Sequence, residues 1–177
     1  FPPRAMRWIL LTFVLAYGVD GINSTLATFS SEAALYEPTA LARLVTGTLM
    51  GIALGSLVMT LWNQIPWQDS DPQPLLNSYR LLGTCLAGGV LVDVLVPAGI
   101  PFLYYPLAIL SSGSVVLLIA MVYTLLWTLV LKRENALVKW QQAPWIFLLG
   151  GISAMAQIAT LDLVRFAITH SWAGFAV

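Results

Sequence analysis

The chain has 177 residues, of which 59% are apolar and only 9% are charged, and its formal net charge is zero. Soluble domains carry about 25% charged residues, so this composition excludes an ordinary soluble domain and predicts one integral-membrane domain over residues 1–177. The balanced charge argues against nucleic acid as a partner. One cysteine, Cys85, allows no internal disulfide.

Ten prolines separate long apolar runs. Proline is disfavoured inside a helix and tolerated at helix starts and in loops. A run of about 20 apolar residues is long enough to cross a hydrocarbon layer of ~30 Å. We therefore expect an all-α, polytopic membrane helix bundle of about five transmembrane helices. The predicted spans cover residues 7–29, 39–63, 75–96, 102–131 and 145–168.

The first span is interrupted by Asp20, about 18 Å from Trp8 at 1.5 Å per residue. A carboxylate at that depth is costly unless it is paired, protonated or hydrated. Asn23 lies one turn away, and Arg43 enters the second span from the same side of the membrane. We predict an intramembrane polar group of Asp20, Asn23 and Arg43. A proton or ion relay and a local break in the helix are the alternatives.

The second span carries Gly47, Gly51 and Gly55 at four-residue spacing, which places them on one helix face. Small residues let another helix approach closely, so van der Waals packing replaces the hydrophobic effect that lipid does not supply. We predict that this stripe packs helices within the chain. A contact with another subunit, a pigment or a lipid tail is the alternative. Gly88–Gly89 and Gly150–Gly151 are interpreted in the same way.

The last three spans hold few polar groups. We expect Asp93 to reach water, and Asp162 and Arg165 to share one helix face as an intrahelical pair. His170 is the only histidine. It is a candidate haem or chlorophyll ligand, and the alternative is an interfacial side chain that binds no ligand. No Cys/His cluster, glycine-rich phosphate loop or Ser–His–Asp set is present in the sequence. We therefore predict no metal site, no catalytic residue, no bound cofactor of its own and no enzyme.

The basic residues predict the orientation in the membrane. Six of the eight fall on the side of the amino terminus, and the positive-inside rule places that side in the cytoplasm. We expect a bacterial inner-membrane protein with a cytoplasmic amino terminus and an external carboxyl terminus. These six residues are Arg4, Arg7, Arg80, Lys132, Arg133 and Lys139.

Three segments resemble a prokaryotic integral-membrane family of unknown function. They are Val-Asp-Gly-Ile-Asn-Ser at 19–24, Leu-Tyr-Glu-Pro at 35–38, and Arg-Leu-Val-Thr-Gly at 43–47 followed by Gly51. Family members typically show Val-Asp-Gly-Leu-Asn-Ser, a Tyr-Glu-Pro turn and Arg-x-x-Thr-Gly, and the match covers about the first third of the chain. The resemblance implies that Asp20, Asn23, Glu37, Arg43 and Gly47 belong to one feature.

The same family carries a Cys-His pair and a Cys-Ala-Arg-Cys motif upstream, and neither occurs in this sequence. The chain begins with Phe rather than Met, so we expect either a processed amino terminus or a piece of a longer protein. Any metal or redox chemistry of the family would then lie in upstream sequence.

Three functions are compatible with this pattern. The first is a non-catalytic accessory or structural subunit of a larger, energy-transducing membrane complex, in contact with the lipid bilayer and with other membrane subunits. The second is a small-solute or ion permease that acts as an oligomer. The third is a membrane redox or metal protein whose site lies upstream. Contact with lipid, quinone or pigment between helices is left open.

Overall fold

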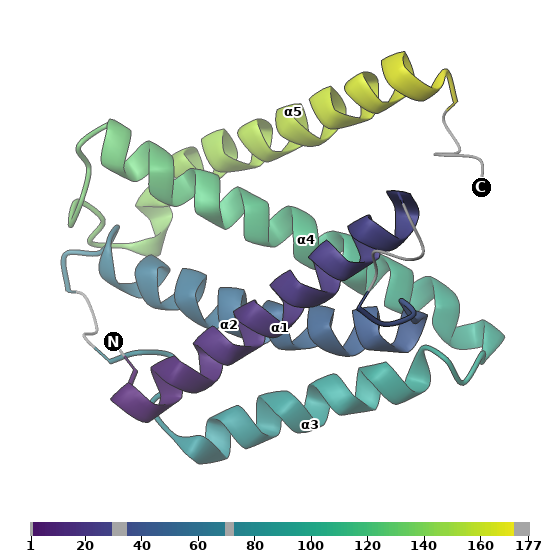
Figure 1. Cartoon of the computed structure of the whole chain (residues 1–177). Helices are drawn as coiled ribbons and strands as arrows, with labels where there is room; N and C mark the ends of the chain where they lie inside the picture. The colour runs from purple at the N-terminus through teal and green to yellow at the C-terminus, as the bar shows by residue number, and fades with distance from the viewer. Residues whose placement is uncertain (1, 30–34, 70–72, 172–177) are drawn as a thin grey trace. The chain divides into compact units, whose positions relative to one another are not determined.

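The fold is all-α, as predicted (Figure 1). The computed structural model describes residues 2–29, 35–69 and 73–171, apart from the side chains of residues 28, 29 and 140. Apart from an isolated backbone bridge between Trp67 and Leu137, the described residues form no β-structure. The helices are α1 (Arg4–Phe29), α2 (Ala40–Gln64), α3 (Tyr79–Leu95), α4 (Pro101–Val130), the short 3-10 helix η2 (Trp140–Gln142) and α5 (Pro144–Thr169).

Four of the helices, α1, α2, α4 and α5, are long and apolar enough to cross a membrane. Helix α3 has 17 residues and a length of about 25 Å, somewhat less than a hydrocarbon layer of ~30 Å. The prediction of about five helices is therefore confirmed, and within the described ranges four of them have the length and composition of spans.

The predicted ends of the spans lie within three residues of the observed helix ends, with one exception. Helix α3 begins at Tyr79, not at 75, because Ser78 caps it by accepting a hydrogen bond from the Arg80 amide at 3.2 Å. Helices α4 and α5 begin at Pro101 and Pro144, where the missing N–H of proline costs no hydrogen bond.

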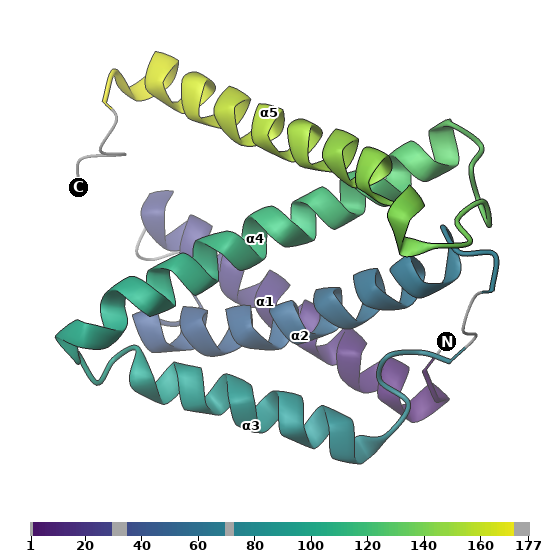
Figure 2. The same ribbon diagram turned by 180° about the vertical axis from the view of Figure 1, so that it is seen from behind.

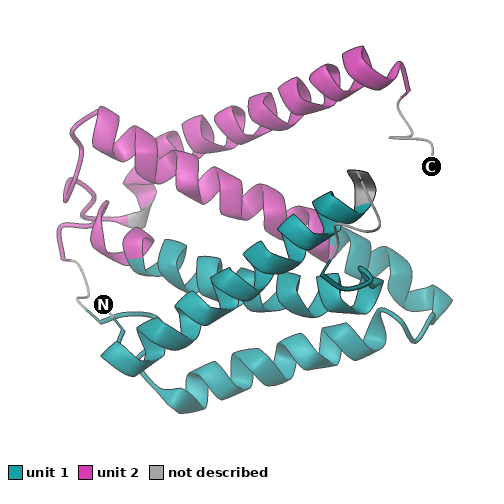
Figure 3. Cartoon of the chain, viewed as in Figure 1, with its two compact units in different colours: residues 1–60, 72–109 teal, residues 61–71, 110–177 magenta. Residues whose placement is uncertain are grey.

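The chain divides into two compact units (Figure 3). Unit 1 contains residues 1–60 and 72–109, and unit 2 contains residues 61–71 and 110–177. The boundaries between the units fall inside helices α2 and α4, which continue from one unit into the other. The division therefore does not separate independent domains along the chain, and the expectation of a single domain stays a prediction.

In unit 1, α2 and α3 run side by side in both views (Figures 1 and 2). Thr48 of α2 joins them in two ways. Its hydroxyl donates to Asp93 Oδ1 at 2.7 Å, and its methyl group lies so close to Gly89 that a Cβ there would be 2.5 Å away. Asp93 is buried, so the expectation that it reaches water is wrong: a threonine on the neighbouring helix satisfies it instead.

The apolar core of unit 1 lies where α1 meets the start of α3. Met6, Leu76 and Leu82 are buried there together. Residues 75–78, predicted as helix, instead form a non-helical lead-in whose Leu75 amide donates to Thr60 Oγ1 at 3.2 Å. Cys85 is half-buried at the edge of this cluster, where it acts as a small apolar side chain.

In unit 2, α4 and α5 approach each other closely at Gly150. A Cβ on this residue would lie 2.5 Å from the carbonyl oxygen of Ala120 and would overlap Thr124. Nearby, Trp127 Nε1 donates to Ser153 Oγ at 2.9 Å. The glycine prediction made for 150–151 is thus confirmed at Gly150, whereas no atom of unit 2 lies within 4 Å of a Cβ on Gly151.

Two connecting segments of unit 2 are joined by backbone hydrogen bonds. The Asn135 amide donates to Ile65, the Leu137 amide donates to Pro66, both at 2.9 Å, and the Gln68 amide donates back to Leu137 at 3.0 Å. The segment after α2 and the segment after α4 therefore meet at the same end of unit 2.

Candidate functional site

The candidate site is a polar cluster where the α1–α2 connection meets the two helices, all within unit 1. Asp20, Asn23 and Ser24 share one face of α1 because residues three and four apart are neighbours on a helix. All three are buried, Asn23 completely. Buried polar side chains in a span need partners, and the connection and α2 provide them.

Asn23 holds the connection to α1. Its side-chain oxygen accepts from the Leu35 amide at 2.7 Å and from the Tyr36 amide at 3.4 Å, and its Nδ2 donates to the Tyr36 carbonyl at 2.9 Å. Asparagine suits this position because its amide both accepts and donates, as a backbone peptide does. These bonds fix the backbone of the connection four to five residues before α2 starts at Ala40.

Asp20 has two hydroxyl partners. Tyr36 Oη donates to Oδ1 at 2.5 Å, and Thr46 Oγ1 lies 3.3 Å from Oδ2. Thr46 has only one hydroxyl proton, and it is closer to the Ala42 carbonyl, at 2.8 Å. Tyr36 is therefore the principal partner of the carboxylate. The hydrogen bond to Asp20, followed by burial and by the negative charge, raises the pKa of Tyr36 above its ordinary value of 10.0.

Arg43 lies in the same cluster but does not pair with Asp20. Its Nε donates to Ser24 Oγ at 3.1 Å, and the ion pair found among the described residues is that of Arg165 with Asp162. A direct Asp20–Arg43 pair, which the sequence suggested, is replaced by two separate contacts, because tyrosine and serine hydroxyls reach the two charged groups first.

Asp20 and Arg43 nevertheless face one cavity. It has a volume of about 670 Å³ and is open on one side, and its walls come from α1 and α2. The cavity is lined by Tyr17, Asp20, Gly21, Ser24, Thr25, Arg43 and Gly47. A carboxylate, a guanidinium and hydroxyl groups thus surround a space large enough for a small polar molecule or several waters.

The glycine stripe on α2 does not pack another helix of its unit. No atom of unit 1 lies within 4 Å of a Cβ built on Gly47, Gly51 or Gly55. Unit 1 therefore does not provide the partner for this stripe, and its packing against another part of the chain or another subunit stays a prediction. The close contact of α2 with α3 is made by Thr48 of α2 and Gly89 of α3. Thr48 follows Gly47 in the sequence and lies on a different face of α2.

The other candidate residues lie apart from this cluster. Glu37 is exposed and makes none of the hydrogen bonds described above. The predicted Asp162–Arg165 pair is confirmed at 3.4 Å. His170 ends α5 in a left-handed conformation, with φ of 50°, and its role as a ligand stays a prediction. Across the described ranges, no group of three or more His, Cys, Asp or Glu side chains is arranged to hold a metal ion.

Sequence reasoning missed two members of the cluster, Tyr36 and Thr46. Both lie inside the segments that carry the family resemblance, which was the available signal. A tyrosine 16 residues after a buried aspartate has no regular spacing that would predict the contact, since the connection between the helices determines it.

The comparisons with known proteins match only the first part of the chain. No curated protein and no solved structure matches the chain. The segment that builds the cluster, from α1 to the middle of α2, does match a family of membrane proteins, and the resemblance seen in the sequence is confirmed there. Residues 2–57 match the family model described as "Predicted membrane protein (DUF2085)".

Proposed function

We propose that the chain is a non-catalytic membrane subunit that binds a larger membrane complex through the glycine face of α2. The observation that supports this is the unfilled stripe of Gly47, Gly51 and Gly55. Two other helical glycines show what a filled position looks like, since Gly89 meets Thr48 and Gly150 meets Ala120 and Thr124. A face of three glycines with no helix against it in unit 1 favours a helix from another protein.

The polar cluster supports the same proposal, because its hydrogen bonds hold α2, which carries the glycine face, in place against α1. Asn23 uses both ends of its amide on the backbone of the connection, and Asp20 is held by Tyr36. These contacts fix the start of α2 relative to α1. A helix whose position is fixed before binding loses less conformational freedom on association.

The size of the solubilised particle tests the proposal. The wild-type chain, extracted from its own membrane in a mild detergent, is expected in a particle larger than one chain with its micelle, as measured by light scattering. Gly51→Leu should reduce the particle to a single chain, because leucine keeps the partner helix away. Gly113→Leu is the matched control, since it adds the same bulk at another helical glycine, one with no described atom of unit 2 within 4 Å of a Cβ.

Two results would contradict this function. One is a wild-type chain that elutes as a monomer under every mild extraction. The other is a Gly51→Leu chain that keeps its partner, because lipid alone would then cover the stripe.

The cavity beside Asp20 favours a second candidate, an ion or small-solute permease that acts as an oligomer. Its walls combine a buried carboxylate with the Arg43 guanidinium, and intramembrane charges commonly mark transport pathways. In proteoliposomes, Asp20→Asn should abolish flux while the chain stays folded. Asp162→Asn, which removes a carboxylate outside the cavity, is the control. If Asp20→Asn leaves the flux unchanged, or if the wild-type chain shows no flux, the permease candidate is excluded.

We also propose an inner-membrane location with a cytoplasmic amino terminus. The excess of basic residues on that side supports it, as does the pairing of segments 65–68 and 135–137, which the topology places on one side. In a Cys85→Ser background, Ala98→Cys should react with an impermeant maleimide on intact cells, and Glu134→Cys should react only after lysis. The reverse labelling pattern would show that the amino terminus lies outside and would contradict the proposed orientation.

A further inference from the structure

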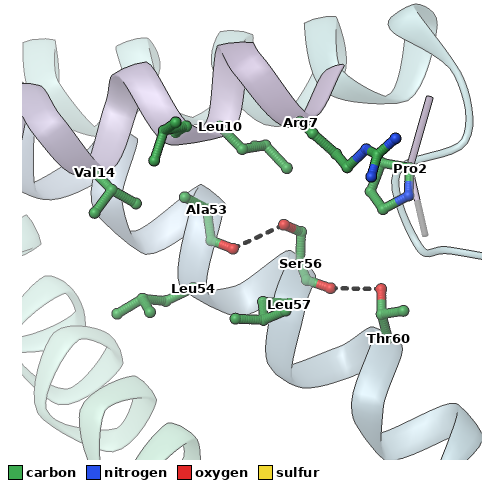
Figure 4. Close-up of a pocket in the computed structure, with 10 residues that line it drawn as sticks. Pro2, Arg7, Leu10, Val14, Ala53, Leu54, Ser56, Leu57 and Thr60 are labelled. Carbon is green, nitrogen blue, oxygen red and sulfur yellow. Dashed lines mark hydrogen bonds between the residues drawn. The ribbon is translucent and has the colours of Figure 1, made fainter. Parts of the chain in front are cut away.

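A second cavity lies between α1 and α2, at the opposite end of the helix pair from the polar cluster (Figure 4). It has a volume of about 280 Å³, and nearly all of its wall is apolar. Leu10, Leu11 and Val14 of α1 face Leu54 and Leu57 of α2 across it. This volume is near the lower end of ligand cavities, about 300 Å³. It therefore suits one narrow, flexible hydrocarbon chain better than a bulky ligand.

The polar atoms in this wall are already bonded. Ser56 Oγ donates to the Ala53 carbonyl at 2.8 Å, and Thr60 Oγ1 donates to the Ser56 carbonyl at 2.7 Å. Both bonds are drawn in Figure 4. Because these hydroxyls are satisfied by their own helix, the wall offers no strong hydrogen bond to a polar occupant. The chemistry of the cavity is that of a hydrocarbon-binding groove.

One end of the groove is cationic. Arg7 lines it beside Pro2, while Val14 and Leu54 lie toward the other end (Figure 4). Arg7 and Leu11 also line an adjoining open cavity of about 430 Å³, together with Arg4 and Trp8. Within the described ranges, neither Arg4 nor Arg7 pairs with an acidic side chain, as the ion pair found there is Arg165–Asp162.

Trp8 marks the level of this end in the membrane. Its side chain is 69% exposed, and tryptophans near the ends of spans lie at the interface between lipid and water. Two unpaired guanidinium groups are thus placed at headgroup level, directly above an apolar groove that descends between α1 and α2. This arrangement is complementary to an amphiphile with an anionic head and a hydrocarbon tail.

We propose that this site binds an anionic phospholipid. The phosphate contacts Arg4 and Arg7 beside Trp8, and one acyl chain lies in the groove between Leu11 and Leu57. The lipid would fill the cavity between α1 and α2 at the end of the helix pair opposite the polar cluster. The site requires neither the proposed protein partner nor a transport activity, so it stands or falls independently of the proposed function.

Native mass spectrometry of the purified chain tests the site with two defined lipids of identical acyl chains, dioleoyl phosphatidylglycerol and dioleoyl phosphatidylcholine. We expect at least about fivefold tighter binding of the anionic lipid. Arg7→Gln should weaken that binding about fivefold, the change that corresponds to about 1 kcal/mol for one basic residue at the surface. Arg80→Gln is the matched control, since Arg80 also lies in the first turn of a helix of unit 1 but lines neither cavity.

The groove is tested separately by filling it. Leu57→Trp, and Leu11→Trp on the opposite wall, should each reduce binding of both lipids, and an unchanged melting temperature shows that the variant is folded. Inorganic phosphate at the same concentration should not compete, because the acyl chain supplies part of the affinity. Equal binding of the two lipids, equal effects of Arg7→Gln and Arg80→Gln, competition by phosphate, or unchanged binding in both folded tryptophan variants would each overturn the site.

Discussion

The α1–α2 pair and the α4–α5 pair are held by different kinds of contact. Helices α1 and α2 are joined by hydrogen bonds at one end, through Asp20 and Asn23, and leave an apolar cavity toward the other. Helices α4 and α5 instead touch at Gly150, where the backbone of one meets the other. Lipid is as apolar as leucine, so apolar burial alone does not associate helices in a membrane. The chain uses both of the remaining means, with hydrogen bonds prevailing in the first pair and close approach in the second, where Trp127 and Ser153 add one hydrogen bond.

The difference predicts that bulk is most damaging in the α4–α5 pair. Gly150→Leu should lower the free energy of unfolding by about 3 kcal/mol or more, because its side chain overlaps Thr124 and the Ala120 carbonyl. Thermal unfolding in detergent measures the loss. Gly151→Leu, one position around the helix with no atom of unit 2 within 4 Å, should change stability by less than about 0.5 kcal/mol. Similar losses in the two variants would show that Gly150 does not determine the packing.

The α1–α2 pair should be most sensitive to loss of hydrogen bonds. Asn23→Leu leaves the Leu35 amide and the Tyr36 carbonyl without their partner, so we expect a loss of about 1–3 kcal/mol. Amide exchange of Leu35 should accelerate in parallel. Thr25→Val is the control, because the Thr25 hydroxyl bonds only the Gly21 carbonyl of its own helix. An unchanged exchange rate at Leu35 would contradict the proposed role of Asn23.

Removing the Tyr36 hydroxyl sharpens the comparison with a smaller effect. Tyr36→Phe deletes one hydrogen bond to Asp20, so its cost should be below that of Asn23→Leu. The raised pKa of Tyr36 means that the folded state favours the protonated phenol. The stabilisation is therefore complete below the unfolded pKa of about 10 and is lost as the pH rises through the higher folded pKa.

The alkaline limb of melting temperature against pH measures this effect. The wild-type chain should lose stability in that range, and Tyr36→Phe should lose less, so that the two curves converge. Tyr105→Phe is the control, because the Tyr105 side chain is 80% exposed, and its curve should follow the wild type. Parallel wild-type and Tyr36→Phe curves would be inconsistent with the Asp20 contact.

The smallest effect is expected for the one side-chain hydrogen bond described between α4 and α5. Ser153→Ala removes the acceptor of Trp127 Nε1, and such bonds in membranes contribute about 0.6 kcal/mol on average. Thr160→Val, which breaks only a bond to its own helix, is the comparison in the same unfolding assay. A loss as large as that of Gly150→Leu would mean that polar contacts, rather than close approach, hold this pair.

The sequence predicted the helices well and the partners of individual side chains less well. Helix positions follow from apolar runs and from proline, which act locally, so the predicted starts at residues 102 and 145 lie one residue from the observed starts of α4 and α5 at Pro101 and Pro144. The burial of Asp20 and Asn23 in one feature was also predictable, because they share a helix face. The choice between Arg43 and Tyr36 as partner of Asp20 depends on the path of the connection, which periodicity does not determine.

Glycine spacing alone did not identify the close contacts. No atom of unit 1 lies within 4 Å of a Cβ on Gly47, Gly51 or Gly55, whereas Gly89 and Gly150, each one member of a Gly–Gly pair, make the close contacts. A small residue permits close approach but does not attract a helix by itself. The opposing side chain decides the contact, and Thr48 and Thr124 are on other helices, where no local pattern points to them.

The polar cluster also bears on how the chain is made. Its hydrogen bonds join residues 12 to 26 positions apart, and a loop of about ten residues closes in about 10–100 ns. At synthesis rates of about 5–20 residues per second, residues 47–95, up to the end of α3, take about 2–10 seconds to be made after Thr46. We expect the first helical hairpin to close during that interval, so that Asp20 acquires its tyrosine before the third helix leaves the ribosome.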